Sequence, residues 1–577
     1  MKRITKALQI PKIDVHCHIE LLPGGRRRSE YRGHDWRPSA DLLVECSDTL
    51  GITECWCSSP ISAGRMAPIE EVRVENDMIL AGMARHPDRI RGLCFVIPGP
   101  DAVAEIERCL DAGMIGIKLY NQYRINDPIV RPIIELAVER QVPILEHAGA
   151  PNAEHKGGQP LISHGVHFAE VNERYPDAII YHAHMGGGGD WEYTIRALRD
   201  CSPNLYIDVS GSVLDHDQVG FAVNELGAKQ VLFGSDGTMA GSVGKVIDAE
   251  ITEEERKLIW WDNAARILAA QDLSPTASQS ETSESSQGVG SGEGTKHHSP
   301  PDLEDPAVGG SNELIDLNAW LGSYPFRSVT SDADTLLTRM DRSGITSAAV
   351  SSIEALYHRN VAPANDRLFD AVSGHERLIP LGTVNPNYPK WEQDLDRCVS
   401  QGARGIRISP QTHNYALTGP VGRDLVAAIS SSGLPVFIPH RIEDPRQRQW
   451  MDPGTTTGSG EIAEIVSRFP ETTVVVNNAR GIYKSPLWQR PDIRDASWYL
   501  DLSLAEIHFG LHWGIESAKD LGHVVAEGGA SHFVFGTHQP FSYVAPAQVK
   551  LMTLGVEDEL FARISAGNAK EILGIED

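Results

Sequence analysis

The sequence is poor in cysteine and in positive charge. Only eight of its 577 residues are cysteine, and none have the paired spacing of a zinc finger. They lie mostly in apolar stretches, as in Cys55-Trp56-Cys57, so we expect buried core thiols rather than a metal clip. Lysine and arginine number 52 against 78 aspartate and glutamate residues, which gives a net charge of −26. This charge disfavours nucleic acids and anionic membranes as partners and favours small molecules.

The first residues lack the pattern of a secretory signal, in which an apolar stretch of about 7 to 15 residues follows a basic start. Between Met1 and Lys12 the sequence is interrupted by Lys2, Arg3 and Lys6. We therefore expect a cytoplasmic protein. The chain is longer than one ordinary domain, and its 41% hydrophobic content is sufficient for real cores.

Residues 272–312 have the composition of a linker. Serine, threonine, glycine, proline and glutamate dominate this segment. Such a composition buries too little apolar surface to offset the entropy lost on ordering. We predict a disordered, flexible linker between two domains, residues 1–271 and residues 313–577. The pair His297-His298 lies inside it, and we expect these side chains to be solvated rather than part of a site.

Short apolar runs alternate with longer amphipathic stretches throughout the first domain. This alternation is typical of strand and helix repeats that build a parallel sheet. The eight runs are Lys12–His18, Ile52–Cys57, Ile90–Ile97, Ile115–Tyr120, Val142–His147, Ala178–His184, Leu205–Val209 and Val231–Gly234. Eight strands with helices between them in about 250 residues predict an α/β domain, a closed (β/α)8 TIM barrel.

The same order recurs in the second domain. Its runs are Leu314–Leu321, Ile345–Val350, Leu378–Val384, Gly405–Ile408, Pro435–His440, Thr473–Asn478, Trp498–Leu502 and Phe533–Gly536. An offset of 302 residues relates Asp14 to Asp316 and also Asp236 to His538. The sequence therefore predicts two (β/α)8 barrels in tandem.

The reactive residues of the first domain stand at the C-terminal ends of its predicted strands, where barrel enzymes carry their active sites. His16 and His18 share one face of the first strand, because alternate side chains of a strand point the same way. Further candidates at strand ends are Lys118, His147, His184 and Asp236. Imidazole and carboxylate groups bind zinc and related ions, so this convergence predicts a metal centre.

The motifs around these residues resemble the amidohydrolase superfamily, and within it the branch of aminocarboxymuconate-semialdehyde decarboxylase. The matching segments are Asp14-Val-His16-Cys-His18, Gly116-Ile-Lys118, Glu146-His147, Ala183-His184-Met-Gly-Gly187, Gly234-Ser-Asp236 and Asn263-Ala-Ala-Arg266. The branch includes decarboxylases, hydratases and lactonases, so the resemblance selects no single reaction. It implies one divalent ion, commonly zinc with manganese as the alternative, bound by His16, His18, His147 and Asp236. It also implies that His184 faces the metal-bound water or the substrate.

A divalent ion in this site would lower the pKa of its water toward about 7 and polarise a carbonyl group. We expect Asp236 or His184 to act as the catalytic residue that accepts the released proton. His182 shares a strand face with His184 and competes for this role. We prefer His184, which stands just before the turn at Gly186–Gly189, and we assign His182 to substrate binding. The glycine run itself either cradles an anion with its backbone amides or allows close approach to the substrate.

Two basic groups are candidates for binding a substrate carboxylate. Lys118 is one, and Arg37, in the arginine-rich segment after the first strand, is the other. The alternative for Lys118 is a carboxylated lysine that bridges two ions. We favour the first role, because the corresponding residue of the second domain is Arg407, which binds anions but cannot be carboxylated.

These features predict a metal-dependent hydrolase that opens a C–N or C–O bond, as in an amide or a lactone, of a small carboxylate-bearing substrate. The alternative is a metal-dependent lyase that decarboxylates or hydrates an unsaturated or aromatic acid. A third interpretation is a binding or scaffold module, which a metal-free protein would support.

The second domain lacks most of the predicted ligands. Asn318 and Trp320 replace His16 and His18, Ala479 falls near the position of His184, His538 replaces Asp236, and only His440 persists as the counterpart of His147. We predict that this barrel binds no metal and takes the place of a second subunit, so that the chain is a pseudo-dimer. The sequence does not decide whether the chain also forms homo-oligomers. Residues kept in both halves, among them Asp14, Asp208 and Ser210, are expected to serve the barrel rather than the chemistry.

Overall fold

A computed structural model gives the fold of the chain. It describes residues 1–19, 37–59, 64–149, 159–185, 190–276, 313–444, 447, 449, 451–452, 454–479, 481–503, 524–525 and 527–575. The arginine-rich segment after the first strand, the Gly186–Gly189 turn and most of the predicted linker lie outside these residues, as does the side chain of Arg37.

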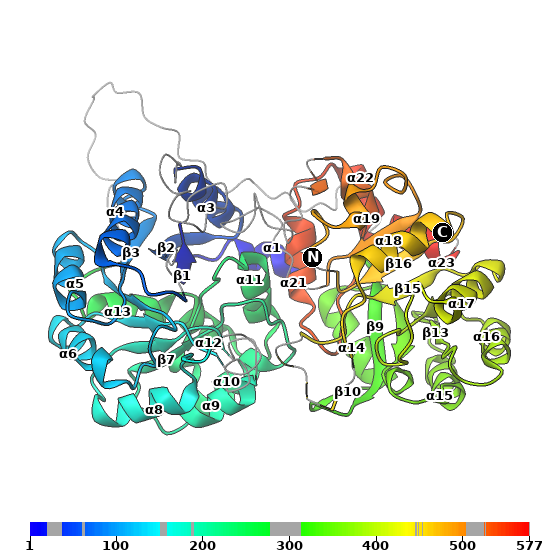
Figure 1. Cartoon of the computed structure of the whole chain (residues 1–577), viewed down its shortest axis with the longest axis horizontal. Helices are drawn as coiled ribbons and strands as arrows, with labels where there is room; N and C mark the ends of the chain where they lie inside the picture. The colour runs from blue at the N-terminus through cyan, green and yellow to red at the C-terminus, as the bar shows by residue number, and fades with distance from the viewer. Residues whose placement is uncertain are drawn as a thin grey trace.

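The first domain is a parallel barrel, as predicted (Figure 1). Its eight strands follow one another around the sheet in chain order: β1 Lys12–His18, β2 Ile52–Ser58, β3 Ile90–Phe95, β4 Gly116–Leu119, β5 Ile144–Glu146, β6 Ile180–His182, β7 Leu205–Asp208 and β8 Val231–Leu232. The chain after β8 closes the sheet on β1, since Val15 N donates to Phe233 O at 3.0 Å and Asp236 N donates to His16 O at 2.8 Å.

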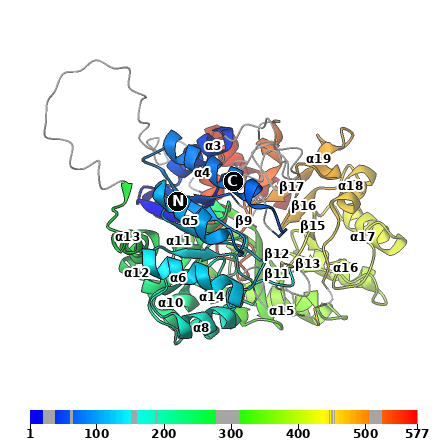
Figure 2. The ribbon, with the colours of Figure 1, turned by 60° about the vertical axis from the view of Figure 1, so that its left-hand side comes forward.

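Helices surround this barrel on the outside (Figures 1 and 2). They are α3 Arg37–Thr49, α4 Ile69–Arg85, α5 Ala102–Asp111, α6 Arg131–Arg140, α8 Gly165–Arg174, α9 Trp191–Leu198, α10 Gln218–Leu226, α11 Met239–Asp248, α12 Glu253–Lys257 and α13 Asn263–Ala269. One apolar core fills the barrel and another lies between strands and helices. All eight cysteines are free thiols and all but Cys201 are buried, which confirms the expectation of core residues.

A register shift in β1 aims its histidines into the barrel. The pairing of β1 with β2 shifts between Asp14 and Cys17. Ile13 and Val15 pack in the inner core, whereas Cys17 packs in the outer one. The carboxylate Oδ1 of Asp14 accepts hydrogen bonds from the backbone of His16 at 3.1 Å and of Ser235 at 2.9 Å. Asp14 therefore stabilises the irregular strand that turns His16 toward the interior.

The second domain repeats the barrel. Its strands are β9 Ile315–Tyr324, β11 Ser347–Ser352, β12 Leu378–Pro380, β13 Gly382–Thr383, β14 Ile406–Arg407, β15 Val436–Pro439, β16 Val474–Asn477, β17 Trp498–Asp501 and β18 Phe533–Val534. Leu317 N donates to Phe535 O at 3.0 Å, which joins the last strand to the first. Two details differ from the prediction: the run Leu378–Val384 is split into β12 and β13, and an added strand, β10 Val329–Ser331, pairs antiparallel with β9.

The helices of the second domain are α14 Ala333–Ser343, α15 Ala362–Val372, α16 Trp391–Ser400, α17 Pro420–Ser431, α18 Ser459–Arg468, α19 Pro486–Gln489, α21 Ala545–Met552, α22 Asp558–Ala562 and α23 Asn568–Leu573. Asn263 and Asn568, at the start of equivalent helices, each donate to the carbonyl of the first residue of the last strand and to a carbonyl just before it. These residues serve the barrel in both halves.

The first domain extends slightly beyond residue 271. Thr276 donates to Glu54 Oε2 from its backbone at 2.8 Å and from its hydroxyl at 3.0 Å, and Leu273 packs on the inner core. Residues 277–312, the rest of the predicted linker, lie outside the described part of the chain.

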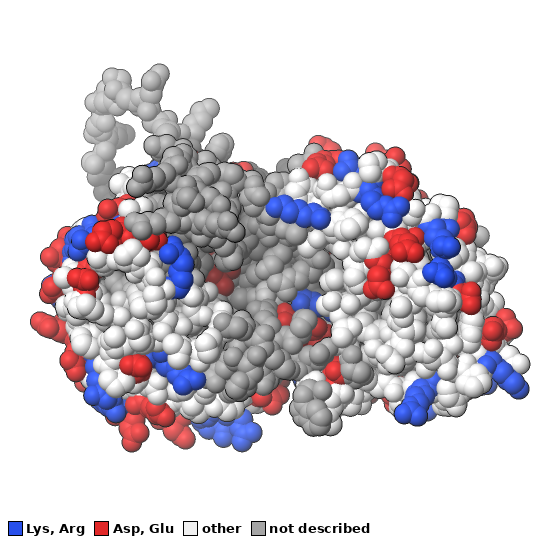
Figure 3. All heavy atoms as spheres, in the orientation of Figure 1, with Lys and Arg blue, Asp and Glu red and all other residues white. Residues whose placement is uncertain are grey.

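The two barrels meet through equivalent helices, the helix after the last strand of each (Figure 1). Here α11 packs on α21 so closely that a Cβ atom on Gly244 would lie 2.4 Å from Pro546 N. On the face shown in Figure 3, the described basic side chains are interspersed with acidic ones over both barrels and form no continuous basic patch. Among the described residues, no helix combines the length and the apolar character needed to cross a membrane.

Candidate metal centre

Three ligand-type side chains meet at the mouth of the first barrel. His18 Nε2 lies 2.9 Å from Asp236 Oδ1, and His16 Nε2 lies 3.7 Å from the same oxygen. All three candidate ligand atoms lie within 4.8 Å of one another. Two imidazoles and a carboxylate around one point fit the donor preferences of zinc and manganese.

The other ring nitrogen of each histidine is held by the barrel. His16 Nδ1 bonds to Asp208 Oδ2 at 2.9 Å, and His18 Nδ1 faces Ser58 O at 3.3 Å. Burial raises the pKa of Asp208, but the neighbouring His16 lowers it to below the ordinary value, so Asp208 is a carboxylate. Partners of this kind fix the imidazole orientation and direct the second nitrogen toward an ion. For both histidines that nitrogen is Nε2, on the side of Asp236.

His184 follows β6 in a left-handed backbone conformation, with φ 58°. Its backbone N donates to Asp208 Oδ1 at 2.8 Å, and its Nδ1 lies 2.9 Å from Ser210 Oγ and 3.5 Å from Asp236 Oδ2. Burial lowers the pKa of His184 to about 4, so the ring is neutral at physiological pH. This neutral imidazole therefore lies beside the three ligand-type groups.

His147 is the fourth predicted ligand. Its Nδ1 lies 3.1 Å from His184 Nε2, and its ring stacks on Tyr120 with centroids 4.0 Å apart. His147 thus adjoins the group of His16, His18 and Asp236 through His184, and is not within the 4.8 Å set itself.

Lys118 also points into the centre. It is fully buried, and its Nζ lies 3.3 Å from His16 Nε2. Burial lowers its pKa to about 8. The structure therefore brings Lys118 together with the predicted ligands.

The structure does not bring His182, the residue predicted to contact the substrate, together with the candidate ligands. Its ring packs on Phe168 of α8, with centroids 4.5 Å apart, while Tyr181 and Ala183 line the inner core. His182 and His184 do not share a face, because β6 ends at His182 and the left-handed turn at His184 redirects the chain. Arg37 begins α3, but its side chain lies outside the described residues.

Sequence reasoning missed two residues of the site. Asp208 and Ser210 were expected only to support the barrel because both halves have them, yet they contact His16 and His184. The available signal was the position of Asp208 at the C-terminal end of β7. In the second barrel Asp501 has the same position and accepts from Asn318 Nδ2 at 2.8 Å.

The second barrel uses the equivalent positions for internal hydrogen bonds. Asn478, with φ 55°, donates from its backbone to Asp501 Oδ1 as His184 does to Asp208. Asn478 is therefore the counterpart of His184, which corrects the assignment of Ala479. His538, the counterpart of Asp236, is held by Asn478 and by Ile442 O at 2.8 Å from its Nε2.

Arg407 and aromatic rings fill the mouth of the second barrel. The Arg407 guanidinium lies 4.3 Å from the ring centroid of Trp320 and donates to Leu317 O at 3.0 Å. Trp320 packs in turn with Tyr324 and Phe541. In the described part of this barrel no three ligand-type side chains come together as they do in the first.

The chain is similar to known proteins at the level of family and fold. The sequence model of a family described as amidohydrolase matches residues 13–269 and 331–575, one segment in each barrel. No curated protein matches the chain. Several solved structures are similar: 2,6-dihydroxybenzoate decarboxylase from Rhizobium (21% identity, 44% of this chain and 97% of that chain, TM-score 0.35), 5-carboxyvanillate decarboxylase from Sphingomonas paucimobilis (18%, 45% and 98%, 0.33) and 4-oxalomesaconate hydratase from Rhodopseudomonas palustris (16%, 47% and 98%, 0.34). At these identities and scores the likeness carries no argument about the reaction.

Proposed function

The chain belongs to the amidohydrolase family, and on this premise we propose that its first barrel is a metal-dependent hydrolase. The proposed substrate is a small carboxylate-bearing molecule with an amide or lactone bond, and the reaction breaks that C–N or C–O bond. The observation that carries the proposal is the group of His16, His18 and Asp236, whose ligand atoms lie within 4.8 Å of one another beside a neutral His184.

The residues that would hold one divalent ion, zinc or manganese, are His16, His18 and Asp236, with His147 as the fourth ligand. When bound, such an ion lowers the pKa of water toward about 7 and polarises a carbonyl group. The carboxylate is ready for this role, because its neighbouring histidines lower the pKa of Asp236 to well below the ordinary value although burial raises it.

His184 is the proposed proton acceptor. Ser210 Oγ donates its only proton to Asp208 Oδ1, at 2.5 Å, so the Ser210 oxygen accepts from His184 Nδ1. This network assigns the ring proton to Nδ1 and leaves the lone pair on Nε2. That nitrogen lies 3.1 Å from His147 Nδ1, and a proton released during hydrolysis would be taken up there.

Lys118 is the proposed anchor for the substrate carboxylate. Its ammonium group is buried beside His16, where a carboxylate would offset the cost of burying a charge. The alternative, a carboxylated Lys118 that bridges two ions, is distinguished by the metal content, which would be two equivalents per chain rather than one.

A lyase is the second candidate, and Lys118 is the observation that favours it. Decarboxylation requires a proton donor to the carbon that loses CO2. With a pKa near 8, Lys118 carries a proton at neutral pH within the same buried site. The same metal ligands would serve this reaction on an unsaturated or aromatic acid.

Product analysis tests both candidates. The purified protein, expressed with added zinc or manganese, is first analysed for metal and then incubated in ¹⁸O water with panels of amides, lactones and aromatic acids. One equivalent of metal, a cleaved C–N or C–O bond and ¹⁸O in the new carboxyl group support the hydrolase. Release of CO2 without ¹⁸O uptake supports the lyase. Absence of metal after supplementation contradicts both and supports a binding module.

A further inference from the structure

The loop after β7, residues 209–217, joins the candidate site to the second barrel. At its start Ser210 Oγ lies 2.9 Å from His184 Nδ1 and also 3.2 Å from His16 Nδ1. The orientation of Ser210 therefore bears on the two imidazoles that the proposed function uses.

The second barrel pairs with this loop through its backbone. Tyr543 N donates to Leu214 O at 2.9 Å, and His216 N donates to Phe541 O at 3.0 Å. Between these bonds Asp215 and Ser542 form an antiparallel bridge. The segment 541–543 follows the last strand of the second barrel. The chain after β18 therefore pairs antiparallel, over a short stretch, with the loop after β7.

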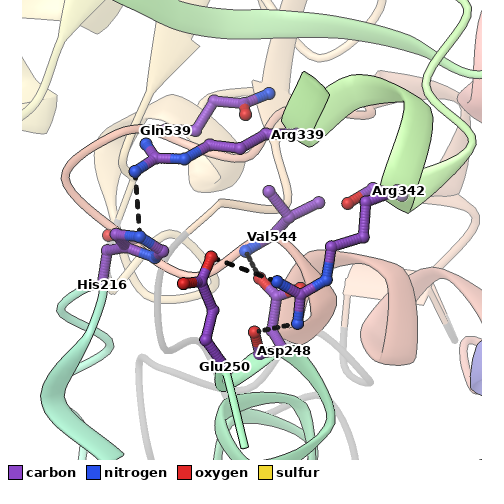
Figure 4. Close-up of a pocket in the computed structure, with 9 residues that line it drawn as sticks. His216, Asp248, Glu250, Arg339, Arg342, Gln539 and Val544 are labelled. Carbon is purple, nitrogen blue, oxygen red and sulfur yellow. Dashed lines mark hydrogen bonds and ion pairs between the residues drawn. The ribbon is translucent and has the colours of Figure 1, made fainter. Parts of the chain in front are cut away.

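Side chains of the second barrel reinforce the pairing. Arg327 forms an ion pair of 3.2 Å with Asp215. Arg339 donates to His216 Nε2 at 3.0 Å, as Figure 4 shows. The side chains of Arg327 and Asp215 are only 16% and 11% exposed, so this pair is less screened than one on the surface. Trp191 Nε1 also donates to Asp215, at 3.0 Å, from the first barrel.

The helix that ends the loop takes its cap from the second barrel. Asp217 is the N-cap of α10, but its backbone is left-handed, with φ 70°, and its side chain makes no capping hydrogen bond. Instead Val219 N donates to Tyr543 Oη at 2.9 Å. One tyrosine therefore binds the loop through its backbone and the following helix through its hydroxyl.

The second barrel also supports Ser210 indirectly, through the packing of α11 on α21. The buried Lys245 of α11 donates to Ser210 O at 3.4 Å and to Gly211 O at 3.2 Å. The preceding residue, Gly244, is the one that packs on Pro546 of α21. The start of the loop is thus supported from a helix that the second barrel covers.

We propose that the second barrel is a positioning element for the first. Through Tyr543 and Arg327 it holds residues 209–217 in place and so orients Ser210 against His184. The inference rests on the proposed function in one respect, the role of His184; the physical coupling of the two barrels does not depend on it.

Hydrogen exchange of the full-length protein tests the coupling. Tyr543→Phe removes the cap of α10, and Arg327→Met removes the ion pair with Asp215 together with the one that Arg327 makes with Glu443. Loss of an N-cap commonly costs about 1 kcal/mol, which corresponds to about fivefold faster exchange if the loop opens locally. Arg342→Met is the matched control: Arg342 bonds to Glu250 and to the backbone of Asp248 across the same interface, but not to the loop (Figure 4).

We expect peptides that cover residues 209–220 to exchange about fivefold faster in Tyr543→Phe and in Arg327→Met, and at the wild-type rate in Arg342→Met. Unchanged exchange in both loop variants, or equal acceleration in Arg342→Met, overturns the proposal.

The visible spectrum of the protein loaded with Co²⁺ tests whether the loop acts on the site. We expect Tyr543→Phe to alter the spectrum and Arg342→Met to leave it as in the wild type. An unaltered spectrum in Tyr543→Phe contradicts the positioning role. If none of the proteins binds Co²⁺, the proposed function fails, whereas the exchange experiment still decides whether the second barrel holds the loop.

Discussion

His16 Nδ1 and Asp208 Oδ2 lie 2.9 Å apart inside the first barrel, and this contact directs His16 Nε2 toward Asp236. In the second barrel Asp501 makes the corresponding contact with an asparagine, Asn318, at 2.8 Å. The same carboxylate therefore orients a candidate ligand in one barrel and closes an internal hydrogen-bond network in the other.

Asp208→Asn is expected to weaken metal binding. The variant keeps the shape of the side chain but loses the charge that fixes the His16 ring, and loss of such a partner typically costs about 10- to 100-fold in affinity. Chelator competition with Zn²⁺ measures the change. Asp501→Asn is the control and should bind Zn²⁺ as the wild type does. Equal affinities for all three proteins would contradict the role of Asp208.

His18→Ala is expected to lose the bound ion. The substitution removes one of the four proposed donors, an imidazole nitrogen that lies 2.9 Å from Asp236 Oδ1, and so weakens the binding of a divalent cation. Elemental analysis of the purified variant should find well below one equivalent of metal. His440→Ala in the second barrel should keep one equivalent, because His440 Nδ1 bonds to Thr457 O and has no ligand-type cluster around it among the described residues. A loss of metal in His440→Ala alone would reverse the assignment of the two barrels.

Glu146 is expected to make the stability of the metal-free protein fall with rising pH. Burial raises its pKa to about 8, so the folded protein retains a proton that the unfolded chain releases above about pH 4.3. This contribution is complete below the unfolded pKa and is lost as the pH rises through 8. We expect the free energy of unfolding, measured with urea, to decrease between pH 5 and pH 8 by roughly a few kcal/mol more in the wild type than in Glu146→Gln. Identical decreases in the two proteins would show that Glu146 is not the group responsible.

Gly244→Ala is expected to destabilise the contact of the two barrels. The added methyl group would lie 2.4 Å from Pro546 N, a backbone atom that cannot move alone, so the two helices must separate. Overpacking of this kind costs about 1–3 kcal/mol, which thermal unfolding detects as a lower Tm. Gly460→Ala in α18 is the control, because its methyl group would meet nothing nearer than 4.0 Å and alanine favours the helix. A Tm that is unchanged in Gly244→Ala would mean that the helices are not in close contact.

The fold was largely readable from the alternation of apolar runs and amphipathic stretches. β1 matches its predicted run from Lys12 to His18, and all seven of its residues are buried, as in a strand covered on both faces. The hairpin strand β10 was missed because it has only three residues, Val329–Ser331, and carries no period of its own. The end of the first domain at residue 271 was predicted from composition alone. Composition does not reveal the hydrogen bonds of Thr276 to Glu54, because these residues are far apart in the sequence.

The sequence predicted the site residues that stand at strand ends. It did not predict those whose placement depends on irregular backbone geometry. His16, His18 and Asp236 converge as predicted. His182 was misplaced because the left-handed turn at His184 has no signature in the pattern of apolar residues. Ser210 was discounted because it recurs in the second half. Its contact with His184 depends on how a loop is held, and part of that support comes from Tyr543, more than 300 residues away.

The packing of Gly244 on Pro546 has a consequence for how this molecule behaves at low abundance. Two separate subunits that associate through such helices would fall apart on dilution, and each would lose the support of the other. Here both belong to one polypeptide, so the association is intramolecular and its strength does not vary with protein concentration. A cell that contains only a few copies would therefore still contain complete assemblies.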